Sequence, residues 1–169
     1  MRPTCGRSDL LSDYDRQQPE NHGHSVIVCE ALSCHVYARR LPFPALAVFL
    51  CTGNYYCSRF AEELFNHQAE RASLPWIAQS RGLALERGAN NVGPIAPVVL
   101  HTLKELTISA RGADRFPRQC TANDLANADF VVAVKEAEHR PLMQERFGEW
   151  EHRLDYWSIH DIELRRLKP

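Results

Sequence analysis

A cysteine, a glycine and an asparagine lie close together where an apolar run gives way to a polar segment. The run covers residues 45–50, and the segment begins Cys51-Thr52-Gly53-Asn54. Glycine and asparagine tolerate positive φ more readily than other residues, so a turn is expected here. Backbone N–H groups in such a turn can converge and form a cradle for an oxyanion. A sulfur at the floor of that cradle would be a nucleophile aimed at the bound group.

A helix is expected directly after this turn, over residues 58–67. Phe60 and Leu64 are spaced as on the apolar face of an amphipathic helix, and Ser58 is predicted to cap it. The helix N-terminus adds partial positive charge to the cradle, which favours the thiolate form of Cys51. A thiolate beneath a bound phosphate is placed for in-line attack on phosphorus.

The elements that must position this loop alternate between strands and helices. Strands are expected at 45–50, 76–80, 129–134 and 153–157, and helices at 58–67, 96–106 and 136–147. The continuous apolar runs are typical of strands buried on both faces of a parallel sheet. The pattern predicts a three-layer α/β/α domain with a central, mainly parallel four-stranded sheet. The cradle follows the first core strand, at the carboxyl edge where such folds bind ligands.

Composition and net charge argue against several classes of function. The 169 residues are 44% hydrophobic and 24% charged, as in an ordinary globular domain. The net charge of −1 argues against nucleic acid or an anionic membrane as the main partner. No apolar stretch approaches the roughly 20 residues of a membrane span, and no secretory signal is recognisable. We therefore expect a cytoplasmic protein with reduced thiols. The cysteine spacings argue against a structural zinc site, and the sequence implies no metal or organic cofactor.

The first 44 residues differ from the rest of the chain in their sequence pattern. Segment 1–24 has neither helical nor strand periodicity, and Pro42 and Pro44 interrupt any regular element. We expect residues 1–44 to be an N-terminal extension that is disordered or loosely packed, and residues 45–169 to form the domain.

Two segments carry a resemblance to a known family. Residues 47–54 read Ala-Val-Phe-Leu-Cys-Thr-Gly-Asn, and residues 58–62 read Ser-Arg-Phe-Ala-Glu. They resemble the phosphate loop of low-molecular-weight protein tyrosine phosphatases, which opens as V-C-x-G-N and reads C-x5-R-S. Thioredoxin-coupled arsenate reductases share that fold. Supporting similarity lies at 79–82, 127–132, 135–140 and 156–161, so the resemblance covers about residues 45–163.

The resemblance implies a hydrolase of aryl phosphate monoesters that forms a phosphocysteine on Cys51. Ser58 would donate its hydroxyl to the thiolate, and Asp161 would be the general acid, with Asp155 as the other candidate. The implied phosphate-binding residues are Thr52, Gly53, Asn54, Tyr55, Tyr56, Cys57, Ser58 and Arg59. The implied partners are a phosphorylated small molecule or a phosphotyrosine protein, and inorganic phosphate or a similar oxyanion in the loop.

The catalytic position six residues after Cys51 departs from the family pattern. The family has a phosphate-binding arginine there, and this chain has Cys57. Arginine clamps two phosphate oxygens and stabilises the transition state, and cysteine can do neither. Losing one well-aimed donor costs on the order of 3–4 kcal/mol, so impaired activity is expected. Arg59, two residues further on, is expected to point elsewhere.

Two departures lie near the end of the chain. Ile162 stands where the family usually has a proline after the acid, which makes that loop less rigid. The family's C-terminal helix is expected to be truncated, because only a short segment remains before Pro169.

Three alternative functions remain open. The chain could be a non-catalytic relative, a pseudophosphatase that holds phosphate or a phosphoprotein without turnover. It could be a redox protein in which Cys51 and Cys57 form a disulfide. Arsenate reduction is a further alternative, but Lys135 stands near where a relay cysteine would be expected.

A basic run formed by Arg111, Arg115 and Arg118 is interpreted as a solvated face.

Overall fold

The computed structural model describes residues 44–88 and 90–159. These residues form a four-stranded sheet with the strand order β2-β1-β3-β4. The strands are β1 (Ala45–Cys51), β2 (Trp76–Gly82), β3 (Phe130–Ala133) and β4 (Asp155–Tyr156). All three neighbouring pairs are parallel, which confirms the predicted sheet.

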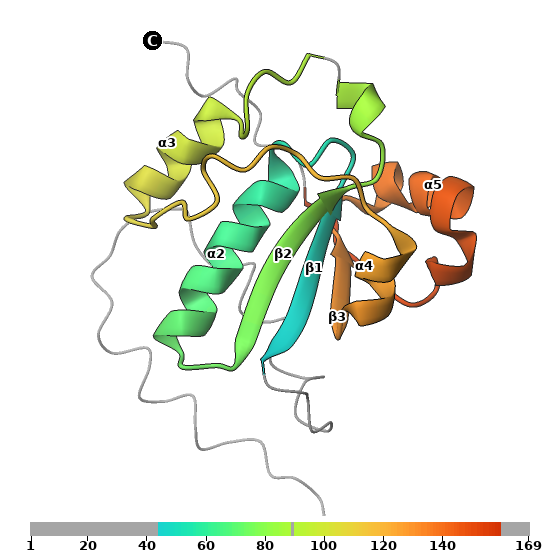
Figure 1. The fold of residues 1–169 in the computed structure, drawn as a ribbon, viewed down its shortest axis with the longest axis horizontal. Helices are drawn as coiled ribbons and strands as arrows, with labels where there is room; N and C mark the ends of the chain where they lie inside the picture. The colour runs from blue at the N-terminus through green and yellow to red at the C-terminus, as the bar shows by residue number, and fades with distance from the viewer. Residues whose placement is uncertain (1–43, 89, 160–169) are drawn as a thin grey trace, which may run out of the picture. The chain divides into compact units, whose positions relative to one another are not determined.

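Helices cover both faces of this sheet (Figure 1). They are α2 (Cys57–Arg71), α3 (Pro97–Glu105), α4 (Ala122–Asn127) and α5 (Glu136–Phe147), with short 3-10 helices η1 (Leu85–Gly88) and η2 (Gly148–Trp150). Figure 1 shows α2 and α3 on one side of the strands and α4 and α5 on the other. The predicted three-layer α/β/α fold is therefore confirmed.

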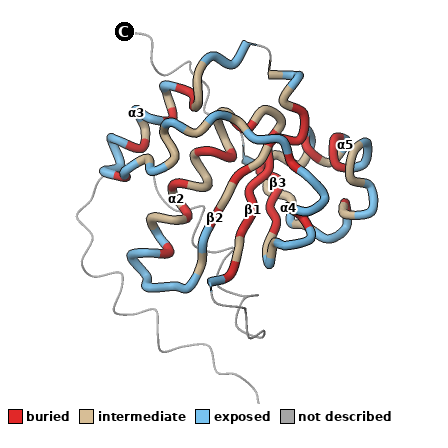
Figure 2. The backbone as a smooth tube through the Cα atoms, viewed as in Figure 1, coloured by how far each residue is buried: buried red, intermediate tan, exposed pale blue. Residues whose placement is uncertain are grey.

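Strand β1 is central in the sheet and is buried along almost its whole length (Figure 2). Its side chains alternate between two packed layers, as expected of a continuous apolar strand. Phe49 faces α2, where its ring centroid lies 5.5 Å from that of Phe65. Val48 and Leu50 belong to the opposite core cluster, which Leu142 of α5 also joins. Burial on both faces fixes the end of β1, and hence the position of Cys51.

Two local expectations are corrected. Helix α4 was not predicted, although Thr121 and Asp124 form a capping box at its start. Ser58 does not cap α2, because the helix begins at Cys57 with Tyr56 as its N-cap and no capping side chain. The Ser58 hydroxyl instead contacts the sulfur of Cys51.

Several predictions fall outside the described residues. They concern the extension over residues 1–43, the truncated C-terminal helix, Ile162 and the candidate acid Asp161. Within residues 44–88 and 90–159, no helix is long and apolar enough to cross a membrane.

Candidate active site

The segment between β1 and α2 forms the predicted turn, with Cys51 at its start. The Cys51 side chain sits among buried residues, with 6% of the residue exposed. Its sulfur lies 2.9 Å from the Ser58 Oγ and accepts a hydrogen bond from the Asn54 backbone N–H at 3.2 Å. Asn54 has a φ of 47°, the left-handed conformation that its residue type tolerates. The backbone therefore turns around the sulfur.

The side-chain amide of Asn54 holds this turn in place. Its Nδ2 donates to the Ser58 Oγ at 3.0 Å and to the Ser80 Oγ at 2.8 Å. Its Oδ1 accepts from the Arg118 backbone N–H at 2.9 Å. Because the Ser58 oxygen already accepts from Asn54, the Ser58 proton is available for the sulfur. This arrangement can support a thiolate, which is the role that the family resemblance implies for Ser58.

Arg115 supports the same network from behind the loop. Its Nη2 donates to Glu62 Oε2 at 2.5 Å and to Ser80 Oγ at 3.1 Å, and its Nη1 lies 3.4 Å from Asn54 Oδ1. Only 17% of its side chain is exposed, so the predicted solvated face is wrong for this residue. Burial raises the pKa of Glu62, against the lowering effects of the Ser80 hydroxyl and the Arg59 charge.

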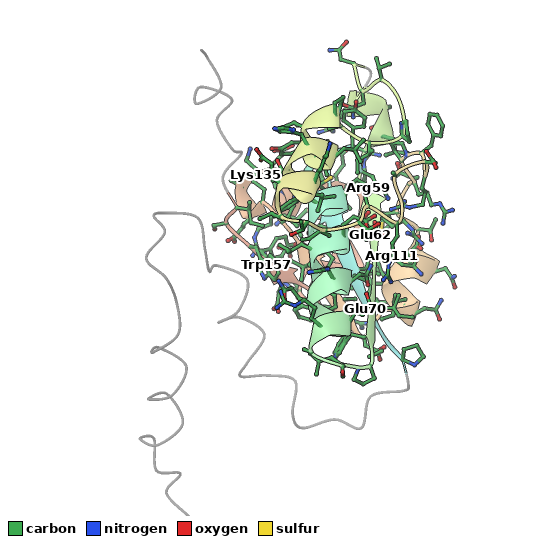
Figure 3. All side chains as sticks on the ribbon, turned by 90° about the vertical axis from the view of Figure 1, so that its left-hand side faces the viewer. Arg59, Glu62, Glu70, Arg111, Lys135 and Trp157 are labelled. Atoms are coloured by element: carbon green, nitrogen blue, oxygen red, sulfur yellow. The ribbon has the colours of Figure 1, made fainter. Side chains whose placement is uncertain are left out.

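Arg59 is also engaged inside the protein. It is 0% exposed, its Nη1 lies 3.2 Å from Glu62 Oε2, and its Nη2 donates to the carbonyl oxygen of Gly112. Figure 3 shows Arg59 and Glu62 together on α2. To bind phosphate, the Arg59 guanidinium would have to leave both partners, so its predicted role as a phosphate ligand stays a prediction.

Two contacts fix the rim of the loop. On one side Thr52 Oγ1 donates to Glu138 Oε1 of α5 at 2.5 Å. This hydrogen bond lowers the pKa of Glu138 against the opposing effect of burial. On the other side the Tyr55 hydroxyl donates to the carbonyl oxygen of Val92 at 2.7 Å. The loop is thus held between α5 and the segment that follows η1.

The remaining predicted residues are placed as follows. Tyr55, Tyr56 and Cys57 are half-buried at the end of the loop and the start of α2. Asp155 is exposed in β4, and because Asp161 lies outside the described residues, the choice of general acid stays a prediction. Among the described residues, Cys51, Cys57 and Cys120 form no disulfide. In the described part of the chain, no group of His, Cys, Asp or Glu residues could hold a metal ion.

Sequence reasoning missed the contacts that support the loop from outside residues 51–58. Glu62, Ser80 and Glu138 lie within segments of recognised similarity, but their hydrogen bonds were not predicted. Arg115 belongs to a separate segment, and local spacing gives no signal for its contacts.

A family model matches this chain over residues 47–162, which is more than half of its length, and describes low molecular weight phosphotyrosine protein phosphatases. The chain therefore belongs to this family. The family and the fold together support a phosphatase-like function. A comparison with curated protein sequences gives no match.

Solved structures give the same family and fold. A YwlE mutant from Bacillus subtilis is 26% identical, with a TM-score of 0.55, over 68% of this chain and 70% of that one. A low molecular weight protein tyrosine phosphatase from T. tengcongensis is 25% identical, with a TM-score of 0.56, over 68% and 72%. Vibrio vulnificus Wzb in complex with benzylphosphonate is 15% identical, with a TM-score of 0.56, over 69% and 73%, and shows the fold alone.

Proposed function

We propose that this chain hydrolyses aryl phosphate monoesters through a phosphocysteine on Cys51. One observation carries the proposal. A buried cysteine sulfur at the carboxyl end of the central strand contacts the Ser58 hydroxyl at 2.9 Å and the Asn54 N–H at 3.2 Å. Both groups can donate a hydrogen bond to a negatively charged sulfur, and thiolate is the nucleophilic form of cysteine.

The reaction has two steps. In the first, the Cys51 sulfur attacks phosphorus and the bond to the aryl oxygen breaks, while Asp161 or Asp155 donates a proton to the leaving oxygen. In the second, a water molecule attacks phosphorus and the S–P bond breaks, which returns the Cys51 thiolate. The same side chain, now a carboxylate, takes the water proton, and inorganic phosphate leaves. Backbone N–H groups of the loop stabilise the phosphoryl oxygens in both steps.

The residue at position 57 sets how fast this reaction runs. Cys57 brings no charge to the phosphoryl oxygens, so turnover is expected to be weak. The same observation favours one alternative, a pseudophosphatase that binds phosphate or a phosphoprotein without turnover. Measurable hydrolysis that depends on Cys51 separates the two. Because Cys51 and Cys57 form no disulfide here, the redox alternative stays a prediction.

The substrate proposal rests on the family and on the loop's aromatic residues. Members of this family are phosphotyrosine protein phosphatases, and one structural neighbour was solved with benzylphosphonate. Tyr55 and Tyr56 are half-buried beside the nucleophile and offer apolar surface to an aromatic leaving group. We therefore favour a small aryl phosphate or a phosphotyrosine protein, acted on by a domain spanning residues 45–169.

Carboxymethylation with iodoacetate tests this function. We expect iodoacetate to modify Cys51, inorganic phosphate to slow that modification, and hydrolysis of an aryl phosphate to be lost in parallel. Cys120 is the internal control, because burial, with the nearby charge of Asp124, raises the pKa of its thiol to about 12. Peptide mass spectrometry reports each site separately.

A Cys57→Ser variant accompanies this experiment, since Cys57 is half-buried and forms no disulfide. It ensures that the activity loss is assigned to Cys51. Modification of Cys51 at the same rate with and without phosphate would show that the loop does not bind the oxyanion, and the proposed function would fail.

A further inference from the structure

The loss of arginine at position 57 raises the question of which cation can reach a bound phosphoryl group. Among the described residues, Arg59 and Arg115 both engage Glu62 behind the loop. Arg87 pairs with Glu145 on α5. These three side chains already have carboxylate partners.

Lys135 lies on the side of the loop where Thr52 contacts α5. It follows β3, and Ala133 of β3 is paired with Leu50 of the parallel strand β1. Lys135 and Thr52 come at the same distance along the chain after these two paired residues, so they lie at the same level beyond the sheet. The Lys135 Nζ lies 3.2 Å from Glu138 Oε2, and the other oxygen of this carboxylate accepts the Thr52 hydroxyl at 2.5 Å. One carboxylate therefore joins the ammonium to the rim of the loop. Figure 3 places Lys135 at the height of Arg59, near the N-terminal end of α2.

Exposure and side-chain shape distinguish Lys135 from Arg59. The Lys135 side chain is 33% exposed, whereas Arg59 is 0% exposed. Lysine carries a compact charge on a flexible stem with three rotatable donors. It can turn from a rim carboxylate to a nearby anion without opening the core. The Glu138 carboxylate would repel a phosphoryl group at the loop, and an adjacent ammonium offsets that repulsion.

We propose that Lys135 is a catalytic residue of this chain, whose ammonium contacts a phosphoryl oxygen and supplies the positive charge that Cys57 does not. Glu138 pairs with the ammonium at the rim between turnovers and competes with the phosphoryl group for it. The proposal rests on the proposed function, because both require an oxyanion in the loop.

Four variants test this role: Lys135→Met, Lys135→Arg, Glu138→Gln and Lys104→Met. Lys104 is an exposed lysine of α3 and serves as the matched control. The readouts are the Kd of inorganic phosphate, from its protection of Cys51, and kcat/KM for an aryl phosphate. Lys135→Met is expected to weaken phosphate binding and to lower kcat/KM, each about 10- to 100-fold, as for a lost charge-assisted hydrogen bond. Lys135→Arg keeps the positive charge and is expected to lose less in both values than Lys135→Met. Lys104→Met should keep both values close to wild type.

Glu138→Gln keeps the proposal testable should Lys135→Met fail to fold. It removes the competing carboxylate and leaves the ammonium, so phosphate binding is expected to tighten. Two results would overturn the role of Lys135: unchanged or weaker phosphate binding in Glu138→Gln, or wild-type phosphate binding in folded Lys135→Met. The proposed function would still stand in both cases, provided that phosphate protects Cys51 in the wild-type protein. If phosphate does not protect Cys51 in the wild-type protein, the proposed function fails and this inference fails with it.

Discussion

Replacing Cys57 by arginine is expected to raise kcat/KM for an aryl phosphate by about 100- to 1000-fold, the effect of one well-aimed donor to a developing oxyanion. Cys57 is half-buried and opens α2, six residues after Cys51. A guanidinium there would bind two phosphoryl oxygens and act with the helix N-terminus. Steady-state hydrolysis of a simple aryl phosphate measures the gain.

The matched control for this substitution is Cys57→Met, which adds a flexible side chain of intermediate length without charge. It should leave kcat/KM near the wild-type value. An arginine variant that is folded and hydrolyses the ester no faster than Cys57→Met would contradict the account of why this loop is slow.

Replacing Cys51 by serine is expected to abolish turnover, with a loss of at least about a thousandfold, as for other nucleophiles that act within a catalytic unit. Serine preserves the size of the side chain and its contact with Ser58. Its hydroxyl, however, stays protonated at neutral pH and is a much weaker nucleophile than a thiolate. The effect is measured most clearly in the Cys57→Arg background, where the starting rate is higher.

Cys120→Ser is the control for this loss. Cys120 is buried in the core cluster beneath α4 and α5, and burial raises the pKa of its thiol to about 12. Its replacement is expected to leave Cys51-dependent turnover in place. Equal rates in the Cys51→Ser and parent proteins would exclude Cys51 as the nucleophile.

The parts of the site that could be predicted are those encoded locally. The apolar run before Cys51 gives a strand buried on both faces, and Asn54 adopts the positive φ that its residue type favours. Residues 51–58 therefore carry the cradle in consecutive positions. Their similarity to a known loop also assigned Ser58 to the sulfur, which it contacts in the structure.

The prediction that Ser58 caps α2 was wrong, because the sequence offered its hydroxyl two partners: the helix backbone and the Cys51 sulfur. A serine at the start of a helix is a common N-cap. Here α2 begins one residue earlier, at Cys57, and the Ser58 side chain is directed to Cys51 and Asn54. At this site the contact with the nucleophile takes precedence over the local rule, as is typical of functional positions.

Long-range support could not be predicted from spacing. Arg115 reaches Asn54 across 61 positions of the sequence, and Glu138 reaches Thr52 across 86. No periodicity connects such segments, because their proximity depends on the order of strands in the sheet. The basic run containing Arg115 therefore resembled a solvated face, and only the fold shows its contact with Glu62.

Acid quenching during turnover, followed by peptide mass spectrometry, tests the central claim most directly. The claim is that the phosphoryl group passes through the Cys51 sulfur. The account predicts a phosphoryl group on the peptide containing Cys51, in wild type at low occupancy and in Cys57→Arg more readily, and none in Cys51→Ser. Hydrolysis that continues at full rate with no phosphoryl group on that peptide, or with one on another residue, would contradict it.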